Sequence, residues 1–271
     1  MKLTPELALK LKSNYNPDGS ILRNCQLRML EELIWFDSLM RKNHIPYWLD
    51  GGTLLGAVRH GGFIPWDDDI DVCIPSKYRT KVRKIFFAEK HPQFVLQCKK
   101  TDPYIYASWD VLRDKKSQYI ELNDNPDGIL HNLKRYQGLQ VDIFPLSNKV
   151  NNFLKEILGR YNLAHYLIIH YGTSLFVKRI ANIVFSIQKS LWAIASFITP
   201  SKKTWTYDYG ISWKSQWDND TIFPLTDIEF EGQHFFAPHN VDIYLKTSYG
   251  DYMNLPDSIE QHNVSSYRLF N

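Results

Sequence analysis

The segment "WDDDIDVCIP", residues 66–75, limits what this chain can fold into more than any other. Four aspartates fall within five residues, and apolar side chains follow at once; the acids are Asp67, Asp68, Asp69 and Asp71. Like charges at this spacing repel one another, and ionised carboxylates are costly to bury without partners. The segment therefore needs either a solvent-exposed edge or a bound cation.

If these residues form a strand, alternation places Asp67, Asp69 and Asp71 on one face and Asp68 on the other. Asp69 and Asp71 would then point to one spot beyond the sheet. Carboxylate oxygens suit a hard divalent cation, Mg²⁺ or Mn²⁺. Such an ion would remove the repulsion that otherwise raises the pKa of one carboxylate.

A second strand is predicted in "GLQVDIFPL", where Asp142 is the only charge in an apolar run. Val141 and Ile143 are expected to pack inward, and Asp142 to face the other way together with Gln140. An isolated carboxylate in such a strand is expensive unless it is paired or metal-bound. Asp142 is therefore the expected third metal ligand.

Gly51 and Gly52 stand between a predicted strand, "IPYWLD", and a predicted helix, "TLLGAVRH". Glycines allow close approach of the backbone, and the start of a helix favours an anion. We expect Gly51, Gly52 and Thr53 to contact substrate phosphate. Metal-binding acids beside a phosphate pocket are typical of phosphoryl transfer.

Arg59 and His60 follow this helix and are candidates for phosphate contact, although a basic pair at a helix end also complements the helix dipole. Arg113 is expected to be a solvated charge, and His262 has no readable partner. Each motif taken singly has an ordinary structural explanation. The ordered combination of glycine pair, Asp-x-Asp and later strand aspartate indicates a functional site.

The rest of the sequence predicts an α+β fold with a mixed sheet flanked by helices. Hydrophobic spacing indicates helices over 21–43 and 76–90 and strands over 93–98 and 104–112. Ser20 and Ser76 are the expected N-caps. We divide the 271 residues into a catalytic core over 1–150, a helical insert over 151–203 and a C-terminal segment over 204–271 that returns to the core.

The composition is that of an ordinary globular protein, and a net charge of +3 gives no argument for binding nucleic acid. Three cysteines without metal-like spacing favour a reducing compartment. The first residues lack the apolar run of a secretory signal, so export is not expected. Cytoplasmic localisation follows.

The insert over 151–203 carries seven Lys and Arg against one Glu, a charge of seven minus one, or +6. It contains a twenty-residue apolar stretch, but Asn182, Gln188, Lys189 and three serines make that stretch too polar for a membrane span. Two hypotheses remain: a basic surface that docks on an anionic membrane, or a helical subdomain that covers the sheet or dimerises.

The stretches over 47–75 and 139–146, and more loosely 244–256, resemble the LicD family. That family includes bacterial phosphocholine transferases and fukutin-type ribitol phosphate transferases. The resemblance implies a nucleotidyltransferase fold, a CDP-alcohol donor and release of CMP. It also implies a metal held by Asp69, Asp71 and Asp142, with Asp67 beside it and the glycine pair at the donor phosphates.

Family frequency favours CDP-choline as donor, and other phospho-alcohols stay open. The implied acceptor is a hydroxyl of a lipid-linked or polymeric cell-surface glycan, such as lipopolysaccharide, teichoic acid or a capsule precursor. Reaction at the inner face of the cytoplasmic membrane would follow. The alternatives are an Asp-x-Asp glycosyltransferase, a nucleotidyltransferase that releases pyrophosphate, and a non-catalytic scaffold, against which the intact acids argue.

Overall fold

The structure is a computed structural model that describes residues 3–120, 126–150, 153, 155, 163–256, 259 and 266–270. Its helices are α1 (Pro5–Tyr15), α2 (Ile21–Lys42), α3 (Gly51–Arg59), α4 (Arg79–Ala88), α5 (Pro126–Leu133), α7 (Leu163–Tyr171), α8 (Leu175–Ile198), α9 (Asn219–Ile222) and α10 (Val241–Tyr249). Its strands are β1 (Trp48–Leu49), β2 (Ile70–Pro75), β3 (Phe94–Gln97), β4 (Asp110–Asp114), β5 (Ser117–Ile120), β6 (Gln140–Ser147), β7 (Thr204–Tyr207), β8 (Gln216–Asp218), β9 (Thr226–Phe230), β10 (Gln233–Ala237) and β11 (Ser266–Leu269).

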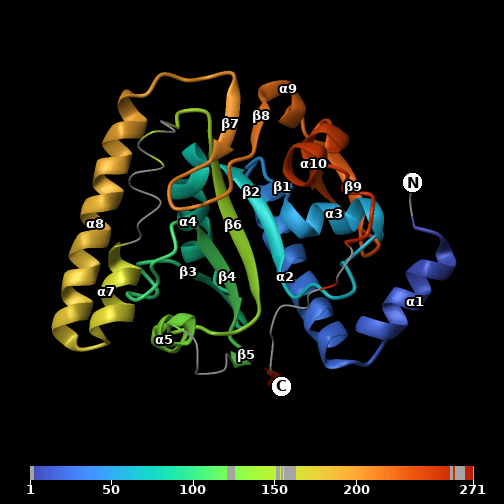
Figure 1. Cartoon of the computed structure of the whole chain (residues 1–271), viewed down its shortest axis with the longest axis horizontal. Coiled ribbons are helices and arrows are strands. Elements are labelled where there is room, and N and C mark those ends of the chain that lie inside the picture. Colours follow the sequence, from blue (N-terminus) through green and yellow to red (C-terminus); the bar gives the residue numbers. More distant parts are fainter. Residues whose placement is uncertain are drawn as a thin grey trace.

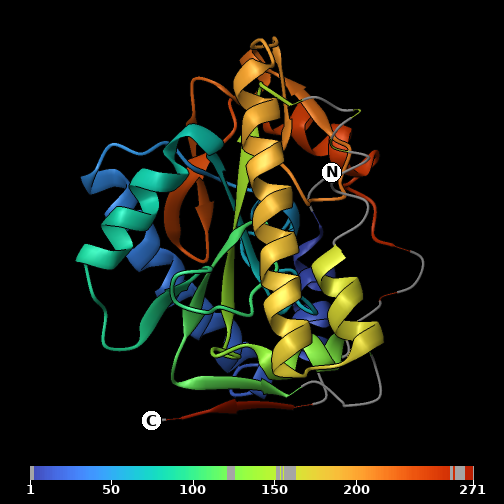
Figure 2. The same cartoon turned by 90° about the vertical axis from the view of Figure 1, so that its left-hand side faces the viewer.

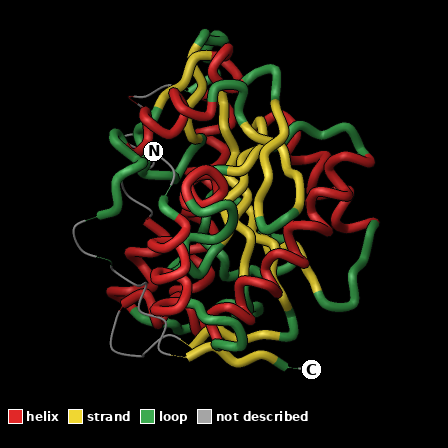
Figure 3. Tube along the Cα trace, turned by 90° about the vertical axis from the view of Figure 1, so that its right-hand side faces the viewer, coloured by secondary structure: helices red, strands yellow, loops and turns green. Residues whose placement is uncertain are grey.

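A mixed sheet with the order β1-β2-β6-β4-β3 forms the centre, and β7 and β8 continue it from the end of β6 (Figure 1). The β2–β6 pair is parallel, and the other described pairs in this sheet are antiparallel. Figure 3 shows helices on both sides of these strands. The predicted α+β class, a mixed sheet flanked by helices, is confirmed.

The main core lies between this sheet and α2, whose apolar residues recur at helical spacing. Met29, Leu33 and Phe36 are fully buried against Val72 and Val141 of the sheet. The helix begins as predicted, because the Ser20 hydroxyl accepts the N–H of Arg23 at 3.2 Å. Helix α2 therefore packs against the sheet that carries the two acidic strands, β2 and β6.

Two predicted elements differ from the structure. The segment expected as one helix over 76–90 begins with a 3₁₀ turn over Ser76–Tyr78, and Ser76 does not cap α4, which begins at Arg79. The strand expected over 104–112 begins only at Asp110. Residues before Asp110 form a loop instead, in which Tyr106 packs against α7 and α8.

Candidate functional site

Asp71 and Asp142 lie side by side because β2 and β6 run parallel with these two residues in register. Adjacent strands lie about 4.8 Å apart, and paired positions present their side chains to the same face. Gln140, two residues before Asp142, also points to this face and donates from Nε2 to Asp142 Oδ2 at 3.0 Å. The predicted orientation of Asp142 is therefore confirmed.

The three preceding aspartates do not alternate along a strand as predicted, because β2 begins only at Ile70. Asp67, Asp68 and Asp69 lie in the loop before it, and one oxygen of each lies within 4.8 Å of the others. Asp68 also accepts a hydrogen bond from the Tyr267 hydroxyl at 2.6 Å. The loop thus brings its carboxylates together without strand geometry.

A cavity of about 460 Å³ joins the loop acids to the strand acids. Asp67, Asp69, Asp71 and Asp142 all line it, together with Gly52. Asp68 does not line this cavity but a neighbouring one of about 260 Å³, which also includes Asp69. The structure therefore gathers the four acids predicted for catalysis around one space.

Burial, and then the charges of Asp69 and Asp142, raise the pKa of Asp71 well above its usual range. Burial also raises the pKa of Asp142, although Arg113 and the indole of Trp109 oppose that effect. Carboxylates packed in this way repel one another unless a cation is among them. An all-oxygen set of this charge fits Mg²⁺ or Mn²⁺.

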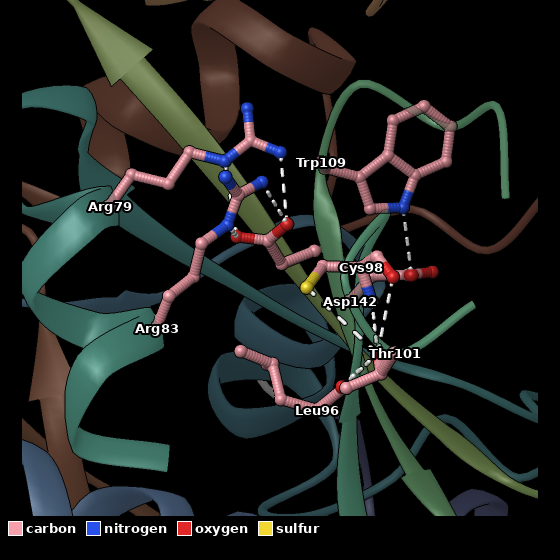
Figure 4. A network of polar contacts seen from close by, with 8 residues as sticks. Arg79, Arg83, Leu96, Cys98, Thr101, Trp109 and Asp142 are labelled. Atoms are coloured by element: carbon pink, nitrogen blue, oxygen red, sulfur yellow. Dashed lines mark hydrogen bonds and ion pairs between the residues drawn. The ribbon is translucent and has the colours of Figure 1, made fainter. Parts of the chain in front are cut away.

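Trp109, which immediately precedes β4, positions Asp142, because its indole N–H donates to Asp142 Oδ1 at 2.9 Å (Figure 4). The next residue, Asp110, is buried and accepts paired hydrogen bonds from Arg79 and Arg83 of α4, at 2.6–3.1 Å. Two guanidinium groups thereby hold the start of β4 in place. The position of Trp109 at Asp142 follows from this anchor.

The two glycines make room for the carboxylates themselves. A Cβ on Gly51 would lie 2.3 Å from Asp71 Oδ2, and a Cβ on Gly52 would lie 2.5 Å from Asp67 Oδ2. Gly51 also has a φ of +52°, which favours glycine. We expected these glycines to admit a phosphate; the space directly above them is occupied by aspartate oxygens.

Thr53 is buried, and its hydroxyl accepts the N–H of Asp71 at 2.9 Å, so it positions that acid. Arg59 is buried too, and it donates to the carbonyls of Tyr252 and Asn254. Burial and the adjacent Arg59 lower the pKa of His60 to about 4. In this arrangement Arg59 ties α3 to the C-terminal segment, and His60 is neutral at pH 7.

Asp50 is a site residue that we did not identify from the sequence. One of its oxygens accepts from Tyr244 at 2.8 Å, and the other accepts from Tyr207 at 2.7 Å and from the Cys73 thiol. Asp50 immediately precedes Gly51, and this position next to the glycine pair is the sequence feature that could have identified it. Through these hydrogen bonds Asp50 connects the glycine turn to Tyr207 of β7 and Tyr244 of α10.

Arg113 corrects another prediction, because it is buried rather than solvated. It donates to Gln97 Oε1 and to the Gly138 carbonyl, each at 2.8 Å. With Asp142 and Trp109 it lines a further cavity of about 310 Å³. His262 lies outside the described residues.

Four aromatic residues also line the 460 Å³ cavity. Trp109, Phe144 and Trp213 contact one another in series, with ring centroids 5.4 Å and 4.9 Å apart. Tyr249 of α10 is the fourth. The cavity is thus lined by both carboxylates and aromatic rings.

Comparison with known proteins agrees with this arrangement. Residues 44–171 match the family model "LicD/FKTN/FKRP, nucleotidyltransferase domain". The chain is 29% identical to the lipopolysaccharide cholinephosphotransferase LicD of Haemophilus influenzae over 256 residues, which is 89% of this chain and 94% of that protein.

Two further relatives are more partial. An uncharacterised protein of Rickettsia prowazekii is 29% identical over 163 residues, covering 54% of this chain and 58% of that protein. The ribitol 5-phosphate transferase FKRP of Mus musculus is 47% identical over 61 residues, covering 22% of this chain and 12% of that protein. The register-paired acids and the glycine turn lie inside the matched region, and residues 44–171 are therefore similar to the nucleotidyltransferase domain of the LicD family.

Proposed function

We propose that this protein transfers a phospho-alcohol from a CDP-alcohol to a hydroxyl of a cell-surface glycan and releases CMP. The observation that carries the proposal is the register pairing of Asp71 with Asp142 at a cavity that Asp67 and Asp69 also line. Likeness over most of the chain to a phosphotransferase that acts on lipopolysaccharide supports it.

In this proposal Asp69, Asp71 and Asp142 hold Mg²⁺ or Mn²⁺. When bound, the ion would neutralise charge on the donor diphosphate, as in other phosphoryl transfers. Burial, and then repulsion by the neighbouring carboxylates, raise the pKa of Asp71, and this supports a cation at this place. Gly52 lines the same cavity, next to the Asp67 carboxylate.

The chain offers two carboxylates to accept the proton of the attacking hydroxyl. Asp142 is held by Trp109 and Gln140, one on each oxygen. Asp67 is half-buried at the rim of the cavity. A base must lie within hydrogen-bond reach of the acceptor hydroxyl, and both residues line the space where it would bind.

Phosphocholine is the favoured group, because ring faces bind a quaternary ammonium that offers no N–H. Trp109, Phe144, Trp213 and Tyr249 supply such faces in the cavity. Ribitol phosphate is the alternative that the likeness to FKRP suggests. We place the reaction in the cytoplasm, which agrees with three free, buried cysteines.

The deciding experiment offers purified protein a panel of CDP-alcohols with Mg²⁺ and glycan acceptors, and measures CMP release and mass gain of the glycan. We expect turnover with CDP-choline, loss of turnover with EDTA, and no pyrophosphate when CTP replaces the donor. Pyrophosphate from CTP would establish a nucleotidyltransferase instead. Transfer of a sugar from a nucleotide sugar would establish a glycosyltransferase.

A further inference from the structure

Helix α8 has one buried and one exposed apolar face. Its inner face is buried in the protein through Ala181, Phe185, Gln188, Trp192 and Ala195. On the outer side, large apolar side chains are 49–86% exposed, and those from Ile183 to Ile194 recur every three to four residues: Phe176, Ile183, Ile187, Leu191, Ile194, Phe197 and Ile198. We call these seven residues the outer stripe.

The polar residues of α8 that make its sequence unlike a membrane segment do not lie on the outer stripe. Asn182 Oδ1 accepts from Lys99 Nζ at 2.7 Å, and Gln188 is buried. Lys189 lies with its ammonium 5.1 Å from the ring centre of Phe185. The polarity that counted against a membrane span therefore belongs mostly to the protein-facing side.

The two exposed serines of α8 form hydrogen bonds within the helix. Ser186 donates to the carbonyl of Asn182 at 2.8 Å, and Ser190 donates to the carbonyl of Ser186 at 2.9 Å. Hydroxyls bonded within their own helix enter an apolar medium at little cost. In Figure 2, α8 crosses the front of the molecule, and no described element lies over its outer side.

The charge around α8 indicates which kind of partner would bind the outer stripe. Residues 163–203 contain no acidic residue and five basic ones: Lys178, Arg179, Lys189, Lys202 and Lys203. Arg179 is exposed on α8, and Lys202 and Lys203 are exposed just beyond its end. Anionic lipids attract such residues, whereas a second copy would bring the same positive charge to the contact.

We propose that the outer stripe docks on the surface of an anionic lipid bilayer, with α8 lying in the plane of the interface. By length and a mean hydropathy of 1.3 over its most apolar 18 residues, α8 is also able to span a bilayer. Spanning would remove Phe185 and Trp192 from their packing in the protein. Shallow insertion keeps that packing and buries only the exposed side.

The docking surface adjoins the candidate site. Ala164 and Ile168 of α7 pack against Ala181 and Phe185 of α8. His165 of α7 lines the 310 Å³ cavity whose other wall includes Asp142. An acceptor anchored in the same bilayer would thus reach the acids past α7.

The test is flotation of the full chain with vesicles of phosphatidylcholine alone or with added phosphatidylglycerol. We expect flotation with the anionic vesicles. The binding should weaken as salt rises from about 0.01 M to about 1 M, because the Debye screening length falls from about 30 Å to about 3 Å. Ile187→Gln with Ile194→Gln should lower vesicle affinity by about 30-fold, since two apolar side chains leave the interface. Leu9→Gln, at a position 69% exposed on α1, is the matched control and should float like the unaltered protein.

Flotation needs no donor and no acceptor, so its result is independent of the proposed chemistry. Three outcomes overturn docking: no flotation with anionic vesicles at low salt, unchanged flotation of the double variant, or retention in the membrane after alkaline carbonate, which would mean a span. A dimer that the double variant converts to a monomer, without vesicle binding, would assign the stripe to a contact between copies.

Discussion

Asp71 and Asp142 are register partners on β2 and β6, the parallel pair of a sheet whose other described pairs are antiparallel. The pairing places both carboxylates on one face of two strands that lie about 4.8 Å apart, the spacing of neighbouring strands. Folding therefore works against charge repulsion at this point. Stability and function are expected to respond in opposite directions when one of the two charges is removed.

Asp71→Asn tests this opposition. Because the variant loses a buried, repelled charge, we expect its melting temperature in EDTA to equal or exceed that of the unaltered protein. CMP release should fall by about 100-fold or more, as when a preorganised electrostatic group is lost. Thermal unfolding with and without Mg²⁺, together with the CMP assay, measures both effects.

Glu229→Gln, at an exposed carboxylate of β9, is the charge-matched control for that variant and should change neither quantity. Mg²⁺ should raise the melting temperature of the control but not that of Asp71→Asn. Equal Mg²⁺ stabilisation of both proteins would exclude Asp71 from the cation site.

Gly52→Ala should separate activity from stability. The added Cβ meets only the terminal oxygen of Asp67, which can swing away, so we expect a stability change below about 1 kcal/mol. Displacement of Asp67 in the cavity should reduce CMP release by roughly 10-fold. Urea unfolding and steady-state kinetics give the two values.

Gly56→Ala is the informative comparison in the same helix. There the Cβ would lie 2.4 Å from the carbonyl oxygen of Gly62, which is backbone, so the variant should lose stability by about 2 kcal/mol. A fully active Gly52→Ala would show that the position of Asp67 has no part in the reaction.

Tyr244→Phe should destabilise the fold from within the core. The hydroxyl donates to Asp50 Oδ1 at 2.8 Å and accepts the indole N–H of Trp48 at 3.1 Å. Its removal leaves a buried carboxylate oxygen and a buried N–H without this partner, at a cost of about 3 kcal/mol. Tyr207→Phe should cost less, since the other oxygen of Asp50 keeps the Cys73 thiol. Urea unfolding would contradict this account if the two variants ranked the other way.

The free energy of unfolding should decrease at acid pH, partly because Asp110 becomes protonated. Burial alone would raise the pKa of this carboxyl, but Arg79 and Arg83 together lower it from 3.8 to about 2. A depressed pKa contributes stability that is complete above pH 3.8 and is lost as the pH falls towards 2, in all about 2 kcal/mol. Asp110→Asn should be less stable at pH 7 and should have a flatter stability profile between pH 4 and pH 2. A profile as steep as that of the unaltered protein would assign the acid sensitivity to other carboxylates.

Local sequence patterns were sufficient for the features that depend on near neighbours. The start of α2, the apolar flanks of Asp142 and its orientation with Gln140 follow from helix capping and from alternation along a strand. The same reasoning misjudged Asp67 and Asp69, because a loop also brings carboxylates together. Arg113 was misjudged as well, because its partners Gln97 and Gly138 come from other segments.

The sequence alone indicated the two acidic segments, the glycine turn and the similarity to the LicD family, because each depends on residues that are contiguous along the chain. Only the tertiary structure decided what surrounds them. Asp50 receives its tyrosine hydroxyls from 157 and 194 residues away, and no local pattern specifies such contacts. The same holds for α8, where apolar residues occur all round the helix. Packing against Tyr106 and Tyr209 selects the buried side and thereby leaves the outer stripe exposed.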